Sequence, residues 1–68
     1  MISYEKFWIT LKKKKVTQYA LVKNHKISTG LLARMRNNEP VSTATIDRLC
    51  NILHCKVQDI IEILPNDK

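Results

Sequence analysis

The stretch VTQYALVKNHKISTGLLARM, residues 16–35, decides the fold because it contains two helix-start signals that lie eleven residues apart. In each signal an apolar residue precedes a hydroxyl residue, and a second apolar residue follows four positions later. The two sets are Val16-Thr17 with Leu21, and Ile27-Ser28 with Leu32. The hydroxyl caps a helix by accepting from an amide of the first turn, and the apolar pair packs together as a hydrophobic staple. The stretch therefore predicts two helices in close succession.

The short distance between Thr17 and Ser28 limits the first helix to about two turns, Gln18 to Asn24. Residues 25–27 are then left to reverse the direction of the chain before the second cap. Two short helices joined by such a turn, each with an inward apolar stripe, form a helix-turn-helix.

A third copy of the signal, Val41-Ser42 with Ile46, predicts a helix from Thr43 to about Leu53. Apolar residues at helical spacing predict two more helices. The first runs from about Tyr4 to Lys14, and a short last one contains Val57, Ile60 and Ile61 and is limited by Pro65. The sequence thus predicts an all-α domain of five helices over residues 1–68.

The composition limits the class of protein. Sixty-eight residues make one domain, and a single glycine with two prolines disfavours an all-β fold, whose turns need more of both. The N-terminus lacks the apolar stretch of a signal peptide, and no segment approaches a membrane span. We therefore expect a cytoplasmic protein whose two cysteines, Cys50 and Cys55, are reduced.

Positive charge is concentrated in the first part of the chain. Residues 1–40 carry nine Lys or Arg and two acidic residues, which gives a net charge of +7. Residues 41–68 carry three Lys or Arg and four acidic residues, which gives a net charge of −1. This asymmetry favours a polyanionic partner for one side of the domain. The alternative is that surface lysines only keep a small protein in solution.

The residue types that most often act in catalysis or metal binding do not form a recognisable active-site or metal-site motif in this sequence. Cys50, His54 and Cys55 lack the paired spacing of a zinc site, and no second pair exists in the chain. The sequence contains no phosphate-binding glycine loop, nucleophile motif or pair of catalytic carboxylates. We therefore expect no enzymatic activity, no cofactor and no metal.

Several stretches in order resemble one known family. They are MISY and W..L in the first helix, T.Y.L and IST..LA.M in the next two, and VST..I.RLC..L.C...DIIE.LP towards the end. The sequence is similar to the lambda-repressor-like, Cro/XRE-type helix-turn-helix regulators, and in particular to small stand-alone bacterial members. The resemblance implies a five-helix domain that binds double-stranded DNA, usually as a repressor. The alternative is a protein-interaction module on the same fold, such as an adaptor or an antitoxin-like partner.

The resemblance also implies site residues, carried over by position. The helix that starts at Ser28 reads bases in the major groove with Ser28, Thr29, Gly30 and Arg34. Phosphate contacts fall to Lys15, Thr17, Gln18, Arg36, Asn37 and Asn38. Two interpretations stay open for Gly30, the only glycine: its missing Cβ allows closer approach to DNA, or a glycine is simply tolerated in a first helical turn. Arg34 is either a guanine reader or a solvated surface residue.

Two positions depart from the family pattern. Lys26 stands where the family usually has a left-handed glycine, and we expect Asn24 to take part of that geometry instead. Val22 stands where alanine is common, so we expect a slightly wider separation of the two helices.

The apolar ends of the chain predict a homodimer. Ile63 and Leu64 follow the last predicted helix, and at least one of them should lack a core partner. We expect them to form an interface patch with Ile2, together with a short two-stranded pairing of the termini. The alternative is that both ends cover one small core and that the protein dimerises only on DNA.

Overall fold

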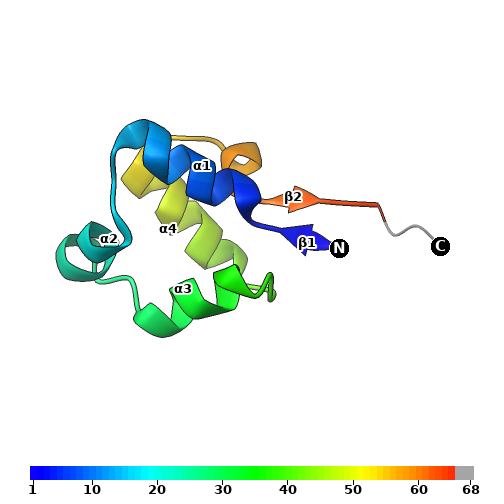
Figure 1. The fold of residues 1–68 in the computed structure, drawn as a ribbon, viewed down its shortest axis with the longest axis horizontal. Helices are drawn as coiled ribbons and strands as arrows, with labels where there is room; N and C mark the ends of the chain where they lie inside the picture. The colour runs from blue at the N-terminus through cyan, green and yellow to red at the C-terminus, as the bar shows by residue number, and fades with distance from the viewer. Residues whose placement is uncertain (66–68) are drawn as a thin grey trace.

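The order of the elements follows the three helix-start signals. The computed structural model describes residues 1–65, which form four α-helices, one 3₁₀ turn and a two-stranded ribbon. In chain order these are β1 (Ile2–Ser3), α1 (Glu5–Lys14), α2 (Gln18–His25), α3 (Thr29–Arg36), α4 (Thr43–Leu53), the 3₁₀ helix η1 (Val57–Asp59) and β2 (Glu62–Ile63). Figure 1 shows α4 between α1 above and α3 below, with the ribbon projecting from one end.

All three predicted caps are present. The hydroxyl oxygen of Thr17 accepts from the backbone N–H of Ala20 at 3.0 Å, and that of Ser28 accepts from Leu31 at 3.0 Å. Ser42 caps α4 in the same way, accepting from Thr45 at 3.1 Å. The apolar residues of the three signals all lie in the core or against it. The local sequence therefore begins α2, α3 and α4 where it was expected to.

A single apolar core joins the helices. Tyr4, Phe7, Met35 and Leu49 have no exposed surface, and the remaining buried apolar residues are Leu11, Leu21, Ile27, Leu32, Ile46, Leu53 and Ile60. Trp8 is half-buried and meets Phe7 edge to face, with ring centroids 4.8 Å apart. The aromatic residues at the start of the chain thus serve packing. Among the described residues, no helix has the length and apolar character needed to cross a bilayer.

The prediction of a fifth α-helix is wrong. Between α4 and residue 65, where the described part of the chain ends, the helical structure is a single 3₁₀ turn, Val57–Asp59. The backbone N–H of Lys56 donates to the Asp59 carboxylate at 3.1 Å at its start. Ile60 is fully buried and Ile61 is half-buried, so both apolar residues reach the core without a longer helix. The chain then extends into β2, because the following residues pair with the N-terminus.

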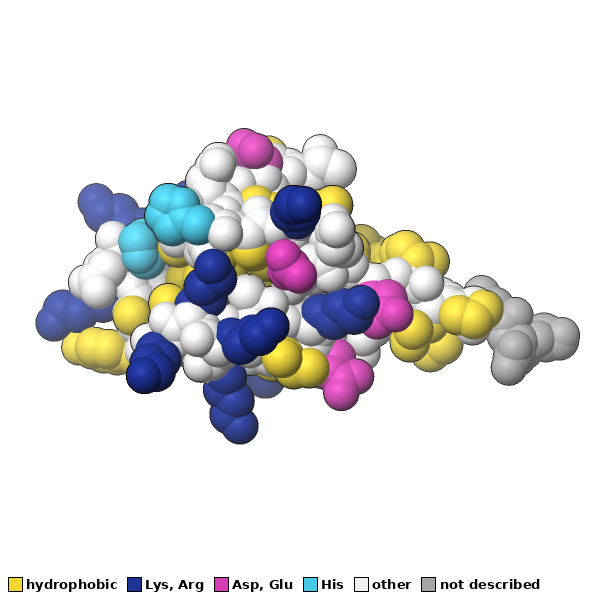
Figure 2. All heavy atoms as spheres, turned by 90° about the horizontal axis from the view of Figure 1, so that it is seen from above, with side chains coloured by type: hydrophobic (Ala, Val, Ile, Leu, Met, Phe, Trp, Pro, Cys, Tyr) yellow, Lys and Arg dark blue, Asp and Glu magenta, His cyan; other side chains and the backbone are white. Residues whose placement is uncertain are grey.

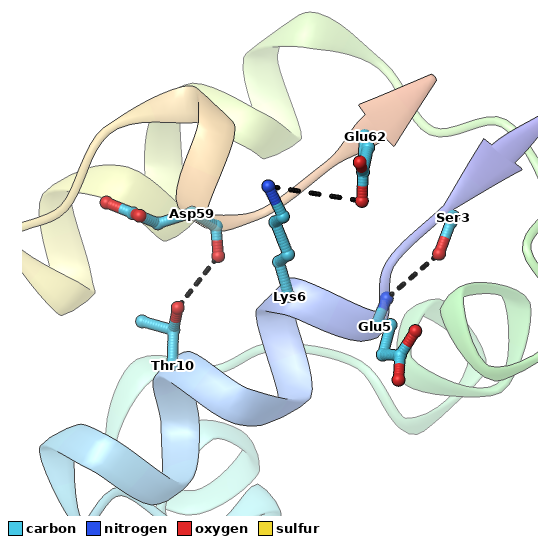
Figure 3. A network of polar contacts seen from close by, with 6 residues as sticks. All are labelled: Ser3, Glu5, Lys6, Thr10, Asp59 and Glu62. Carbon is cyan, nitrogen blue, oxygen red and sulfur yellow. Dashed lines mark hydrogen bonds and ion pairs between the residues drawn. The ribbon is translucent and has the colours of Figure 1, made fainter. Parts of the chain in front are cut away.

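The terminal pairing that the sequence suggested occurs within one chain. β1 and β2 are antiparallel, with Ile2 opposite Ile63 and Ser3 opposite Glu62. Figure 3 shows two contacts that hold this end of the chain on α1: the Thr10 hydroxyl donates to the Asp59 carbonyl oxygen at 2.8 Å, and Lys6 lies 4.0 Å from Glu62. The Lys6 and Glu62 side chains are 49% and 42% exposed, so this ion pair adds little stability and the buried hydroxyl adds more.

Candidate nucleic-acid interface

The turn between α2 and α3 is closed without a glycine. Lys26 itself takes the left-handed conformation, with φ 57°, and its N–H donates to the Leu21 carbonyl oxygen. The expectation that Asn24 would take part of this geometry is wrong, because Asn24 lies inside α2. Arg48 on α4 donates from its guanidinium to the carbonyl oxygen of His25, next to the strained residue.

The four residues predicted to face DNA bases lie together at the surface of α3. Ser28, Thr29, Gly30 and Arg34 are all exposed, while Leu32 and Met35 on the opposite side of the helix are buried in the core. α3 therefore has one side fixed by packing and one side open to a partner. Ser28 uses its hydroxyl oxygen as the helix cap, which leaves its hydroxyl hydrogen as the free group.

Gly30 has no structural need to be a glycine. Its φ is not positive, and a Cβ built at this position would meet only the Ser28 hydroxyl oxygen, 4.0 Å away. Neither turn geometry nor packing within the chain explains the residue. This leaves the two interpretations named above, a close approach to a partner or a tolerated first-turn glycine.

Two of the predicted phosphate contacts are joined to each other. The guanidinium of Arg36, at the end of α3, donates to the side-chain oxygen of Gln18, the first residue of α2, at 3.2 Å. This contact places a positive charge beside the N-terminal amides of α2, where an anion is favoured. Both side chains are exposed.

The other predicted phosphate contacts have mixed surroundings. Lys15 ends α1 in a left-handed conformation with φ 59°, and Thr17 caps α2. Asn37 follows α3 with an exposed side chain. Asn38 has φ 56°, and its side-chain oxygen accepts from the backbone N–H of Tyr4 at 3.2 Å. Asn38 thus fastens the start of α1, a role that the sequence analysis missed.

A further exposed pair on α2 was also missed. Tyr19 is 69% exposed, and the Lys23 ammonium lies 5.6 Å from its ring centroid and donates to its hydroxyl at 3.3 Å. The spacing of four residues on a helix is the only sequence signal for this contact. The pair follows Gln18 directly and extends the exposed side of α2.

The predicted dimer residues lie on the ribbon. Ile63 is 69% exposed and Leu64 is 37% exposed, whereas Ile2 is half-buried and packs against the core. Figure 2 shows Lys and Arg side chains over the helical body and hydrophobic side chains gathered at the ribbon end. The apolar ends therefore stand apart from the basic part of the surface.

Comparison with known proteins agrees with this geometry. Residues 6–66 match the sequence pattern of the Cro/C1-type helix-turn-helix DNA-binding domain. The chain belongs to this family. The crystal structure of the transcriptional regulator VanUg, form II, is similar to the Cro/C1-type domain described here, with a TM-score of 0.85 and 32% sequence identity. The match covers 96% of this chain and 87% of that chain. Among curated proteins, none matches the chain significantly.

In the chain, α2 and α3 form the helix-turn-helix of this Cro/C1-type domain, and α3 has one buried and one exposed side. In this family member the left-handed turn is occupied by Lys26, and Val22 lies half-buried against the core. No group of three or more His, Cys, Asp or Glu side chains able to hold a metal ion is found within residues 1–65.

Proposed function

We propose that this protein is a sequence-specific regulator of transcription that binds double-stranded DNA as a homodimer and acts as a repressor. The observation that carries the proposal is the exposed side of α3, where Ser28, Thr29, Gly30 and Arg34 lie together. A recognition helix enters the major groove with its N-terminal residues near base edges. Repression then requires only that the bound protein occupies its site.

Arg34 is the residue that reads sequence in this proposal. Its planar guanidinium forms two hydrogen bonds to O6 and N7 of guanine, worth about 1–3 kcal/mol of discrimination. Arg34 is exposed one turn into α3, and the helix is held from behind by Leu32 and Met35. A side chain that reads bases needs such a fixed backbone beneath it.

Gln18 and Arg36 form the centre of the phosphate contacts. Their mutual hydrogen bond of 3.2 Å arranges both side chains before DNA arrives, so less side-chain entropy is lost on binding. Lys15, Thr17 and Asn37 extend this surface. Asn38 contributes through its backbone or its amide nitrogen, since its side-chain oxygen is bound to Tyr4.

The homodimer uses the outer edge of β2. Met1 and Leu64 exchange two backbone hydrogen bonds of 2.8 and 2.7 Å. The next pair along the ribbon, Ile2 and Ile63, is therefore a non-hydrogen-bonded pair, and its backbone N–H and C=O groups point outward from the ribbon. The outer edge of β2 therefore presents the backbone N–H and C=O groups of Ile63 and its exposed side chain to a partner strand. A second β2 strand added there continues the ribbon across a two-fold axis, which gives the two recognition helices of a paired DNA site.

Selection of bound fragments from random duplex DNA tests the proposal. We expect one enriched, two-fold symmetric sequence whose half-sites lie about one helical turn apart. Roughly 6–10 phosphate contacts per dimer should make the logarithm of affinity fall steeply with the logarithm of salt concentration. No enrichment, together with a flat salt response, would favour the protein-interaction module instead.

Single substitutions distinguish contacts made by the proposed phosphate surface from a general effect of the protein's positive charge on DNA binding. Lys15→Ala and Gln18→Ala should weaken binding to all duplexes to a similar extent, and Lys15→Ala should also reduce the salt slope by about one unit. Lys56→Ala removes one exposed charge at the start of η1, which packs against α1 and α4. This control should leave the affinity and the salt slope nearly unchanged.

A further inference from the structure

Two cysteines lie side by side where α4 ends. Cys50 is in the last turn of α4, and His54 reverses the chain in a left-handed conformation with φ 53°. The backbone N–H of Cys55 then donates to the carbonyl oxygen of Cys50 at 3.1 Å. This is the six-residue hydrogen bond of a Schellman motif, which is frequently accompanied by a contact between the side chains of these two positions. Both thiols are free and half-buried.

The electrostatics of Cys55 include an effect of the neighbouring Cys50. Burial is the main cause that raises the pKa of Cys55 to about 11, followed by the charges of Cys50 and Asp59 and a hydrogen bond with the Cys50 side chain. Lys14 acts in the opposite direction. Burial and these neighbours therefore favour the protonated form of the Cys55 thiol.

A hollow gives access to Cys55. Its volume is about 460 Å³, and it is lined by Thr10, Lys13, Lys14, His54, Cys55, Lys56 and Asp59. Three lysine ammonium groups against one carboxylate give this hollow a net positive charge. A small anionic reagent is therefore attracted to the one thiol that lines it.

We propose that Cys50 and Cys55 are an oxidisable dithiol, which a small anionic disulfide entering the hollow converts into an intrachain disulfide. The Cys55 thiolate attacks one sulfur of the reagent, the reagent's S–S bond breaks, and one thiolate leaves. The Cys50 thiol then loses its proton, and its thiolate attacks the sulfur of Cys55 and displaces the second thiolate. The two protein thiols lose two electrons and two protons, and the reagent becomes two thiols.

The backbone geometry favours ring closure over capture of a second chain. A disulfide needs Cα atoms about 4.4–6.8 Å apart, a separation suited to two residues joined by a backbone hydrogen bond across a tight helix end. Cys50 is joined to Cys55 by the backbone hydrogen bond, so the mixed disulfide at Cys55 has a partner thiol nearby in the same chain. The high pKa of Cys55 means that the reaction is slow near neutral pH and accelerates as pH rises, because the thiolate is the attacking form.

Mass spectrometry of the intact protein after incubation with oxidised glutathione tests the proposal. The reduced protein should lose two hydrogens without gaining glutathione, and dithiothreitol should reverse the change. Cys50→Ser should stop at one glutathione on Cys55, and Cys55→Ser should remain largely unmodified. A wild-type protein that stays reduced even at alkaline pH, keeps bound glutathione, or forms disulfide-linked dimers would overturn the proposal.

A charge-reversal variant tests the hollow separately. Lys56→Glu should make oxidation by oxidised glutathione roughly threefold slower and oxidation by the cationic disulfide cystamine faster. Circular dichroism of each variant confirms that it is folded. Equal rates with both reagents before and after the substitution would show that the hollow is not the route of access.

Discussion

Arg48 on α4 donates a hydrogen bond from its guanidinium to the backbone carbonyl oxygen of His25, the last residue of α2. The carbonyl groups at a helix end lack partners within the helix, and the negative end of the helix dipole favours a cation there. The contact lies beside Lys26, which closes the helix-turn-helix with φ 57°. The third helix-start signal, at Ser42, thus begins a helix, α4, that also stabilises the turn between α2 and α3.

Lys26→Gly should stabilise the protein by about 0.5–1 kcal/mol, because relief of the left-handed strain exceeds the entropy that glycine adds to the unfolded chain. Urea denaturation measures the change. Lys23→Gly is the control within α2, where Lys23 is exposed: this variant should lose about 1 kcal/mol from helix propensity and, in addition, the contact with Tyr19. A loss of stability in Lys26→Gly would mean that the lysine side chain has a role that its backbone does not indicate.

Gly30→Ala should separate stability from DNA binding. The added methyl group meets nothing closer than the Ser28 hydroxyl at 4.0 Å, so the folded protein should gain about 0.5 kcal/mol from better helix propensity. DNA affinity should fall if α3 approaches the bases closely at this position. Thermal unfolding and fluorescence anisotropy measure the two effects. A more stable variant with unchanged affinity would favour the interpretation that the glycine is merely tolerated.

How far the sequence could predict this fold depends on the range of each interaction. Thr17, Ser28 and Ser42 cap helices through residues three positions away, so their roles could be read locally and are confirmed. The prediction of a fifth helix rests on the helical spacing of Val57, Ile60 and Ile61. It is wrong because the pairing of β2 with the N-terminus extends the chain instead. Local spacing carries no information about that distant partner.

The candidate site shows the same limit. The exposure of Thr29 and Arg34 follows from the burial of Leu32 and Met35 on the other side of the same helix, and could be anticipated. The contact of Asn38 with Tyr4 spans 34 residues and had no local signal. Contacts of this kind need the folded arrangement, because they depend on how separate helices are placed.

Arg34→Ala should lose discrimination at one base pair of each half-site, by about 1–3 kcal/mol. Arg34→Lys should recover only part of it, because lysine lacks the planar pair of donors. Arg36→Ala is the matched control on the same helix: it should weaken all duplexes alike, since Arg36 pairs with Gln18 at the proposed phosphate surface. Competition binding with a set of single-base variants distinguishes the two patterns. A uniform loss in Arg34→Ala would show that Arg34 does not read bases.

The free energy of unfolding should decrease at alkaline pH. Burial raises the pKa of Tyr4, and it raises that of Cys55 from 9.0 to about 11. The unfolded chain releases these protons at lower pH than the folded chain, so the free energy of unfolding decreases above about pH 9, by at most about 1.4 kcal/mol per pH unit for each group.

Urea denaturation between pH 8 and about pH 11, with a reductant present, measures this slope. Cys55→Ser should reduce it, because serine has no ionisation in this range, while the Tyr4 contribution remains. An unchanged slope in Cys55→Ser would mean that the folded environment of Cys55 does not disfavour the thiolate.

Ile63→Asp should convert the proposed dimer into a monomer. Ile63 is 69% exposed, so the substitution should change the stability of a single chain by less than about 0.5 kcal/mol. In the proposed interface, however, the two introduced carboxylates would face each other across the two-fold axis and repel one another. Sedimentation at micromolar concentration should show a smaller species, and affinity for a paired DNA site should fall towards that for a single half-site. Val57→Asp is the control, because Val57 is 53% exposed but lies on η1, away from the edge of β2. A wild-type protein that is already a monomer, with both variants binding DNA as well as it does, would remove the ribbon from the interface and leave the role of α3 intact.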